Sequence, residues 1–400
     1  MSAGLPRRKP SECRIGLFVT ALALGCILMA MATEGSLISV RDDDPGPRTL
    51  PASDRQSAPA RKPPAETPVR GVWVHPAVSR NEAAGVPEIE KTLDAYAQAG
   101  INTVILLVKD TAGYVYYKSA IGVADPAWDY DFLGAWVREA KKRNIAVHAW
   151  FCVFNEGAVL GRTREHLDWF VTNRHGEKTE VLNPALPEAR QFELSLMMEV
   201  ATRYPVDWIH LDYIRFPCAP AEPYFSYDAR TRKLFKDHSG WDPLEIKAQD
   251  SGNIIWNEWL EWNRDQVTQF VRELRESLKT TGRTVRISAA VFPNADNARV
   301  LIGQDWPKWA ELGLVDMLCP MLYTNHAGFF EKLTRQAVGH GKGHCLVCPG
   351  IGIGTSHNQN TPEGMLEQMR ISKDVGADGV IYFSGSSLTE PFLEKLRGAK

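Results

Sequence analysis

Four acidic residues follow short apolar runs of the sequence, where a carboxylate could take part in acid–base chemistry. Asp212 ends the run Trp-Ile-His-Leu-Asp, while Asp110, Glu156 and Asp296 each follow another run. A carboxylate at the end of a buried run is costly unless it is paired or hydrated, so these residues are functional candidates. Two carboxyl groups on either side of a glycosidic bond can cleave it, one as acid and one as nucleophile or base. We predict Asp212 as nucleophile or base and expect its partner among the other three, with Glu156 favoured because neighbouring aromatic residues could raise its pKa.

A second set of residues combines polar hydrogen-bonding groups with aromatic rings near the ends of the same runs. The polar members could bind sugar hydroxyls or stabilise charge, and the aromatic members could stack on sugar faces. For each histidine a structural role is an equal alternative, Trp150 and Tyr382 could also be core residues, and Arg215 or Lys109 could be a structural ion-pair partner of Asp212. The set comprises His75, Lys109, Trp150, His210, Arg215, Asn294, Tyr323 and Tyr382.

From residue 69 onward the sequence alternates short apolar runs with helical stretches, which is typical of parallel strands joined by helices. Eight such units predict an α/β fold of the (β/α)8 TIM-barrel type. An open doubly wound sheet is the second choice, because no Gly-rich phosphate loop follows the first strand. The predicted strands are Gly71–His75, Thr103–Lys109, Ala146–Cys152, Trp208–Asp212, Val285–Phe292, Met317–Tyr323, Cys345–Gly350 and Gly379–Ser384, and the predicted helices are Val86–Ala99, Tyr130–Arg143, Pro187–Tyr204, Ile255–Lys279, Trp306–Leu314, Gly328–Gly339 and Pro362–Val375.

Two insertions follow the third and fourth predicted strands, at Phe154–Pro184 and from Cys218 to about Asn253. Both would lie at the carboxyl ends of strands, where barrel enzymes build their sites. The second insertion is rich in aromatic residues, which fits either a platform for a glycan or a small lobe packed on itself. These aromatic residues are Tyr224, Phe225, Tyr227, Phe235 and Trp241.

Side chains alternate between the two faces of a strand, and in a barrel one face meets the helices and the other meets the axis. In the fourth strand the aliphatic Ile209 and Leu211 should pack on helices, so His210 and Asp212 should point inward. The same reasoning predicts an inward orientation for His75, Trp150, Lys109 and Tyr382 on their own strands.

The N-terminal segment predicts export. Basic residues from Arg7 to Arg14 precede an apolar run from Ile15 to Ala32, which fits a cleaved signal peptide or an uncleaved membrane anchor (residues 1–32). Residues 33–68 read as a disordered linker, and residues 69–400 as the barrel domain. The domain should therefore lie outside the cytoplasm, periplasmic, secreted or anchored to the membrane. A net charge of −2 provides no basic field, so we expect no nucleic-acid partner.

Several motifs together resemble the glycosyl-hydrolase-like family 10 group. They are Arg70-Gly-Val-Trp-Val-His75, Leu182-Asn-Pro-Ala-Leu-Pro-Glu-Ala-Arg190, Val206-Asp-Trp-Ile-His-Leu-Asp212, Asp305-Trp-Pro-Lys-Trp309 and Pro320-Met-Leu-Tyr323. The resemblance implies a (β/α)8 barrel acting on bacterial cell-wall or related polysaccharide, with peptidoglycan glycan strands among the substrates it suggests. Members of the group often have a second acid directly after the residue that corresponds to Asp212. Here that position is Tyr213, as in a sibling group of glycoside-hydrolase-like proteins, so a mechanism that needs a second acid at this position is in doubt.

Three other functions are weighed against a hydrolase. A metal-dependent barrel hydrolase usually has His-x-His on its first strand, whereas this chain has His75-Pro-Ala, so we expect neither a metal nor another cofactor. A Schiff-base lyase would need Lys109 to be buried with a depressed pKa, although the adjacent Asp110 suggests a charged pair. The main alternative is a carbohydrate-binding or cell-wall-binding barrel that has no catalytic activity.

Overall fold

The structure is a computed structural model that describes residues 67–157, 162–218, 225–247 and 252–399. The predictions for the signal or anchor and the linker, and for Tyr224, lie outside these residues. Where the chain is described, no helix has both the length and the apolar character needed to cross a membrane.

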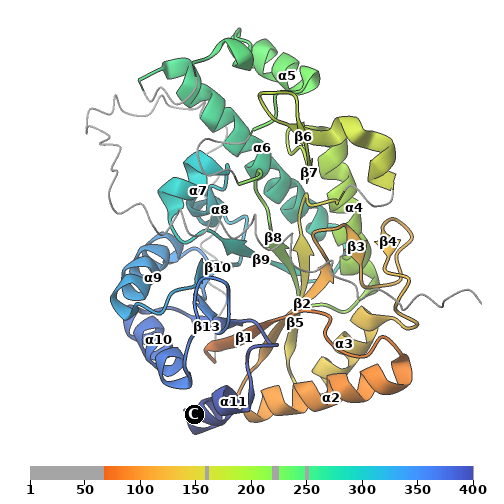
Figure 1. The fold of residues 1–400 in the computed structure, drawn as a ribbon, viewed down its shortest axis with the longest axis vertical. Helices are drawn as coiled ribbons and strands as arrows, with labels where there is room; N and C mark the ends of the chain where they lie inside the picture. Colours follow the sequence, from red (N-terminus) through yellow and green to blue (C-terminus); the bar gives the residue numbers. More distant parts are fainter. Residues whose placement is uncertain (1–66, 158–161, 219–224, 248–251, 400) are drawn as a thin grey trace, which may run out of the picture.

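Parallel strands form a closed eight-stranded barrel with helices around it (Figure 1), which confirms the predicted fold. The barrel closes because β1 pairs with β2 on one side and with β13 on the other. The seventh predicted strand is split into two short pieces that both pair with β10. The barrel strands are β1 (Val69–Val74), β2 (Thr103–Lys109), β5 (Ala146–Cys152), β8 (Trp208–Asp212), β9 (Arg286–Val291), β10 (Met317–Leu322), β11 (Leu346–Val347) with β12 (Gly350–Gly352), and β13 (Gly379–Phe383).

Helices cover the outside of the barrel, and several of them begin at polar capping residues. The side chains of Asn81, Asp131, Asn253 and Thr361 each accept a backbone N–H of the first helical turn that follows. Their apolar faces are buried against the strands, which holds the strand ends in place. The helices are α2 (Glu82–Gln98), α3 (Phe132–Lys141), α4 (Pro187–Arg203), α6 (Ile254–Lys279), α7 (Ala295–Leu301), α8 (Trp306–Glu311), α9 (Ala327–Gly341), α10 (Pro362–Val375) and α11 (Glu390–Gly398).

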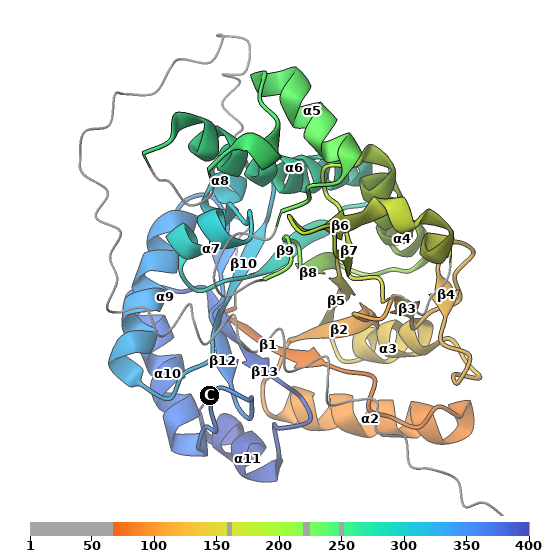
Figure 2. The same cartoon turned by 45° about the horizontal axis from the view of Figure 1, so that its top comes forward.

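Both predicted insertions are present and lie beside each other at one end of the barrel (Figure 2). The first contains η2 (Arg162–Trp169) and the hairpin of β6 (Phe170–Thr172) and β7 (Lys178–Leu182), and the second contains α5 (Ala229–Ser239) and η3 (Pro243–Glu245). A further short extension, β3 (Tyr114–Val115) and β4 (Val123–Ala124), follows β2.

The aromatic residues of the second insertion pack mainly against the tryptophans of α6. The ring of Phe235 lies 4.7 Å from that of Trp259, and Trp259 stacks on Trp262 at 5.4 Å. Phe225 and Tyr227 are buried in the same cluster, whereas Trp241 is 49% exposed. Three of the predicted aromatic residues are therefore packing residues, but they pack on α6 and not in a lobe of their own.

An irregularity in β2 makes one orientation prediction wrong. The pairing of β2 with β5 shifts between Leu107 and Lys109, so that Leu107 pairs with Trp150 while Lys109 pairs with Phe151. A bulge of this kind inserts one residue and reverses the side of the sheet that later residues face. Lys109 therefore points outward to the helix layer, where it meets Glu193 on α4, and not inward to the barrel axis.

Candidate functional site

Asp212 lies at the carboxyl end of β8, beside Cys152 at the end of β5. Its side chain is nearly covered, and its Oδ1 accepts the backbone N–H of Tyr213 at 2.7 Å. Burial raises the pKa of Asp212, while the positive charge of Arg215, the Tyr213 N–H and the side chain of Trp150 act against this rise. The result is a buried carboxylate whose charge is supported on one side.

Arg215 is the cation of this site. Its Nη1 lies 3.6 Å from Asp212 Oδ1, and its guanidinium group lies 4.3 Å from the ring centroid of Tyr213 and 5.0 Å from that of Phe292. Aromatic faces attract a cation held in this way. Nη1 is buried and has no hydrogen-bond acceptor among the described residues. Arg215 therefore supports the charge of Asp212 without a close hydrogen bond to it.

The backbone at Tyr213 has a left-handed conformation, with φ of 53°. This conformation costs about 1–3 kcal/mol for a residue other than glycine and is often found at functional sites. Here it turns the Tyr213 N–H back onto the carboxylate of the preceding residue. The strain thus contributes directly to the surroundings of Asp212.

Aromatic rings surround the strand ends near Asp212. The exposed His75 lies edge-on to Trp150 and to Phe383, with centroids 5.0 Å and 5.8 Å apart. Tyr323 stacks on Phe383 at 5.2 Å, and the charge of Asp212 is one cause of the raised pKa of Tyr323, after burial. The predicted residues His75, Trp150 and Tyr323 are thus brought together beside Asp212, and rings of this kind can pack on sugar faces.

Tyr382 does not join this group, so its predicted inward orientation is wrong. Its hydroxyl donates to Met369 Sδ on α10 at 2.9 Å, and it pairs in register with the outward-facing Val72. Phe383 takes the inward position. The sequence Gly379-Val-Ile-Tyr-Phe383 is apolar throughout, so alternation of polar and apolar residues could not identify the inward face.

His210 points inward as predicted, but it is completely buried and both ring nitrogens have partners. Trp73 Nε1 donates to His210 Nε2 at 3.1 Å, and Ser288 Oγ lies 2.8 Å from Nδ1 of both His210 and His148. An indole N–H can only donate, so His210 holds its proton on Nδ1 and donates it to Ser288. Ser288 then donates to His148. Burial lowers the pKa of His210 to about 3, so this chain of neutral groups is structural and the predicted contact of His210 with substrate is not available.

Two of the predicted acid partners are poorly placed for the acid role, because one is held in a turn and the other is exposed to solvent. Asp110 closes a tight turn, because its carboxylate accepts the N–H groups of Ala112 and Tyr114 and the hydroxyl of Tyr116. Asp296 is exposed in the first turn of α7. The side chain of Asn294 caps the same helix by accepting the N–H of Asn297 at 2.8 Å.

Glu156 belongs to a buried cluster with Lys109 and Glu193. Lys109 Nζ lies 3.0 Å from Glu156 Oε1 and 3.0 Å from Glu193 Oε1, and it also donates to the carbonyl oxygens of Cys152 (3.0 Å) and Asn155 (2.7 Å). Burial alone would lower the pKa of Lys109, but the two carboxylates raise it above its ordinary value. Burial raises the pKa of Glu156 and of Glu193 against the opposing charge of Lys109. A Schiff-base role for Lys109, which needs a depressed pKa, is therefore unsupported.

Glu193 and Ser288 were not predicted. Glu193 lies on the apolar stripe of α4 with Ala189, Leu196 and Val200, all buried. A charged residue on such a stripe is a signal for a buried ion pair and could have been noticed. Ser288 is one small residue in an otherwise apolar strand, and nothing in its sequence context distinguishes it.

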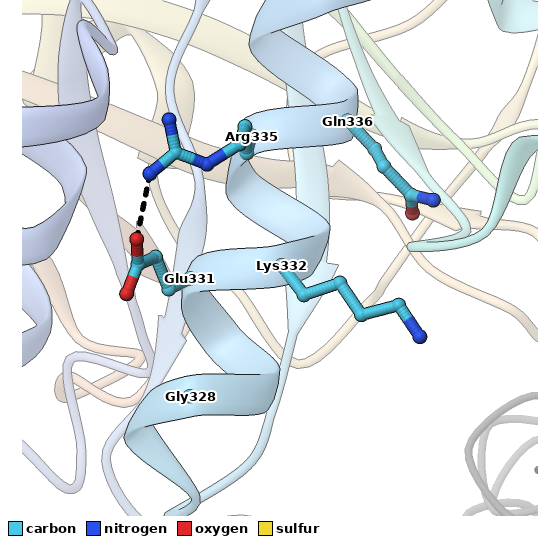
Figure 3. Close-up of a pocket in the computed structure, with 5 residues that line it drawn as sticks. All are labelled: Gly328, Glu331, Lys332, Arg335 and Gln336. Atoms are coloured by element: carbon cyan, nitrogen blue, oxygen red, sulfur yellow. Dashed lines mark hydrogen bonds and ion pairs between the residues drawn. The ribbon is translucent and has the colours of Figure 1, made fainter.

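The described part of the chain holds no group of three or more His, Cys, Asp or Glu residues suited to a metal ion. A depression on the surface of α9 is lined by Gly328, Glu331, Lys332, Arg335 and Gln336 (Figure 3). There Arg335 pairs with Glu331 at 2.6 Å. None of these residues belongs to the strand ends around Asp212, so this depression is separate from the candidate site.

A closed barrel with a buried carboxylate at its strand ends makes this a (β/α)8-barrel protein with a candidate site at the carboxyl ends of its strands. The chain belongs to the Glycosyl hydrolase-like 10 family, whose sequence profile matches residues 68–365. It is similar to Glycosyl hydrolase YngK of Bacillus subtilis (25% identical over 269 residues, 59% of this chain) and spans about half (48%) of that relative's length. It is also similar to Glycosyl hydrolase DigH of Escherichia coli K12, with 24% identity over 336 residues that cover 69% of this chain and 71% of DigH.

Solved structures share the fold. The glycoside hydrolase domain of PgaB (BpsB) from Bordetella bronchiseptica superposes with a TM-score of 0.66 at 15% identity, covering 83% of this chain and 98% of that domain. The catalytic domain of β-amylase from Paenibacillus polymyxa has a TM-score of 0.57 at 12% identity, covering 82% of this chain and 97% of the domain. At such low identity the likeness shows the barrel fold alone.

Proposed function

We propose that the protein is an exported glycoside hydrolase that cleaves a polysaccharide by paired-carboxylate catalysis. The observation that carries this proposal is Asp212, a carboxylate supported by Arg215 and the Tyr213 N–H and surrounded by aromatic rings at the strand ends. Membership of a glycosyl-hydrolase-like family supports the same reaction class.

In the proposed reaction an acid residue gives its proton to the glycosidic oxygen while the bond from that oxygen to the anomeric carbon breaks. The Asp212 carboxylate either attacks the anomeric carbon or accepts a proton from the attacking water. We assign the acid role to Glu156, because it follows β5, next to β8, and burial favours its protonated form. Asp110 is the second candidate, since it is only half-buried and lies close enough to Cys152 to influence its pKa.

The proposed substrate is a cell-wall polysaccharide, with peptidoglycan glycan strands as the first to be tested. This choice follows from the expected export and from the family, whose members in the comparisons carry the name glycosyl hydrolase. The rings of His75, Trp150 and Tyr323 are the surfaces on which sugar faces would stack.

The test measures soluble oligosaccharides released from purified peptidoglycan and from a panel of other glycans. We expect the wild-type protein to release products, and Asp212→Asn to lower the rate by roughly 100-fold or more while still sedimenting with the glycan. Asp207→Asn is a matched control, because Asp207 is an exposed carboxylate at the opposite end of β8 and should leave the rate unchanged. A wild-type rate in Asp212→Asn would refute the assigned mechanism.

A carbohydrate-binding barrel without catalytic activity is the second candidate function. It is favoured by the engagement of Asp110 in a turn and of Glu156 in a buried ion pair. Sedimentation of the wild-type protein with a glycan, with no product released from any glycan of the panel, would establish this function and exclude the hydrolase.

A further inference from the structure

The guanidinium group of Arg215 is held beside Asp212 mainly by packing. Its Nη1 lies 3.6 Å from Asp212 Oδ1, which is beyond hydrogen-bond distance, and no described residue accepts a hydrogen bond from it. The group lies instead against the rings of Tyr213 and Phe292, 4.3 Å and 5.0 Å from their centroids. Because Arg215 is only 7% exposed, these two rings determine where its charge lies.

The charge of Asp212 depends on the position of Arg215. Burial is the largest influence on the pKa of Asp212 and raises it, and Arg215 is the main charge that opposes this rise. The thiols and phenol groups that experience the charge of Asp212 have pKa values raised by burial, so they are neutral at neutral pH; they are Cys152, Tyr213, Cys319 and Tyr323. Asp110 also acts on Cys152, but its carboxylate is held in a turn of its own.

A buried glutamine joins the two segments that position Arg215. Gln304 lies between α7 and α8 and is completely buried. Its Oε1 accepts the backbone N–H of Phe292 at 2.8 Å, and its Nε2 donates to the carbonyl oxygens of Ala290 at 3.4 Å and of Ile214 at 3.5 Å. Ile214 directly precedes Arg215. One side chain therefore connects the backbone that carries the ring of Phe292 to the backbone that carries the guanidinium group.

The same segment also contacts the residue that follows Arg215. The backbone N–H of Phe216 donates to the carbonyl oxygen of Ile302 at 3.0 Å. Gly303 has a φ of 66°, and a side chain there would come within 3.1 Å of the Phe216 ring. The chain that leads to Gln304 is thus packed closely on the loop after β8, and Arg215 is fixed on both sides in the sequence.

We propose that Gln304 is a positioning residue that holds Arg215 against Phe292 and beside Asp212, and so keeps Asp212 in the ionised form that a nucleophile or base needs. This inference rests on the proposed hydrolase function and adds to it a residue whose hydrogen bonds reach neither Asp212 nor the side chain of Arg215. Without the amide of Gln304 the two segments lose their shared partner, and the guanidinium group is no longer held beside the carboxylate. Burial then favours a protonated Asp212.

The direct test follows the side-chain carboxyl carbon of Asp212 by carbon-13 NMR in the full-length protein, with the signal assigned by its loss in Asp212→Asn. Gln304→Met keeps the length of the side chain but makes none of the hydrogen bonds, so Asp212 should titrate at a higher pH than in the wild-type protein. Arg215→Met sets the upper limit of this shift, about 1–3 pH units. Phe292→Leu removes the ring but leaves the backbone hydrogen bond to Gln304, and it should shift the titration in the same direction.

Gln368→Met is the matched control. Gln368 is another buried glutamine whose amide joins two segments, because it donates to the carbonyl oxygen of Thr324 at 2.6 Å and accepts from Asn360 Nδ2 at 2.9 Å. Neither partner borders Arg215 in the sequence, so the titration of Asp212 should stay at its wild-type pH. An equal shift in Gln368→Met and Gln304→Met would overturn the proposal, because any damage to a buried amide would then produce it.

The activity test uses the pH dependence of kcat/KM. Protonation of Asp212 would set the acid limb, so Gln304→Met should move this limb to higher pH by the same amount as the NMR titration. Above the limb the rate should return toward the wild-type value. A purely structural role for Gln304 would lower the rate at every pH and leave the limb in place.

The two proposals fail in different ways. A wild-type titration of Asp212 in Gln304→Met would overturn the role of Gln304 even if Asp212-dependent hydrolysis is found. If Gln304→Met does not fold, a wild-type titration in Phe292→Leu overturns it equally, since the effect of Gln304 passes through that ring. The expected NMR shifts together with no hydrolysis of any glycan would overturn the hydrolase, while leaving the control of the Asp212 charge intact.

Discussion

Replacing Lys109 by methionine should destabilise the protein strongly at neutral pH and much less in acid. Methionine keeps the apolar stem but removes the cation that lies 3.0 Å from both carboxylates and donates to two carbonyl oxygens. A carboxyl group that Lys109 keeps ionised in the wild-type protein would then take up a proton in the folded state. Holding that proton at about pH 7 against an unfolded pKa of about 4.3 costs about 1.4 kcal/mol per pH unit, or about 4 kcal/mol in total. At about pH 5 the same cost falls to about 1 kcal/mol.

The sign follows from the raised pKa of a buried carboxyl group. Such a group stabilises the folded state below its unfolded pKa, and this stability is lost as the pH rises. The unpaired carbonyl oxygens add about 1–3 kcal/mol at both pH values. Urea unfolding followed by circular dichroism at the two pH values would give the difference, which we expect to be about 3 kcal/mol.

Lys142→Met is the control for this experiment. Lys142 pairs with Glu139 at 2.8 Å, but its side chain is 58% exposed, so its loss should cost less than about 1 kcal/mol at either pH. An equal loss of stability for Lys109→Met at both pH values would refute the argument, because it would mean that the carboxyl groups do not take up a proton when the lysine is removed.

Three further predictions concern other parts of the site. Gly113→Ala should abolish hydrolysis, because the new methyl group would collide with Glu156. Gly176 has a similar positive φ but open space around it, so Gly176→Ala should only lower the free energy of unfolding by about 1–3 kcal/mol. Ser288→Ala should lower the unfolding free energy by about 2–4 kcal/mol in urea, since two buried histidine nitrogens lose their shared partner, and a loss below about 1 kcal/mol would contradict the network. Tyr382→Phe should leave glycan sedimentation unchanged while Phe383→Ala weakens it, and the reverse result would contradict their assigned orientations.

The fold could be predicted because the spacing of apolar residues along the sequence reflects which side chains are buried. Buried parallel strands are continuous apolar runs, so the bounds of β2, β5 and β8 follow directly from the sequence. Helix starts follow from capping residues such as Asp131 and Thr361. The split of the seventh strand was not predicted, since Cys345–Gly350 is one continuous apolar run in the sequence.

The site could be predicted only where alternation is unbroken. Asp212 and His210 were placed on the inward face because Ile209 and Leu211 mark the outward face of a regular strand. Lys109 was misplaced because a bulge leaves no mark in residue types. The engagement of His210 by Ser288, and of Lys109 by Glu193, depends on contacts between distant segments that local patterns do not contain.

The bulge in β2 also determines which changes of chain length the protein can tolerate. Leu107 faces the barrel axis opposite Trp150, so in a regular strand the residue after it faces outward. Deleting Val108 would therefore remove the bulge and leave Lys109 opposite Phe151, still facing the two glutamates. An insertion of the same size in the loop after β3 would change no side-chain orientation within the barrel. β2 should therefore tolerate the loss of its bulge residue, whereas one further residue that no second bulge absorbs would turn Lys109 toward the barrel axis and away from both glutamates.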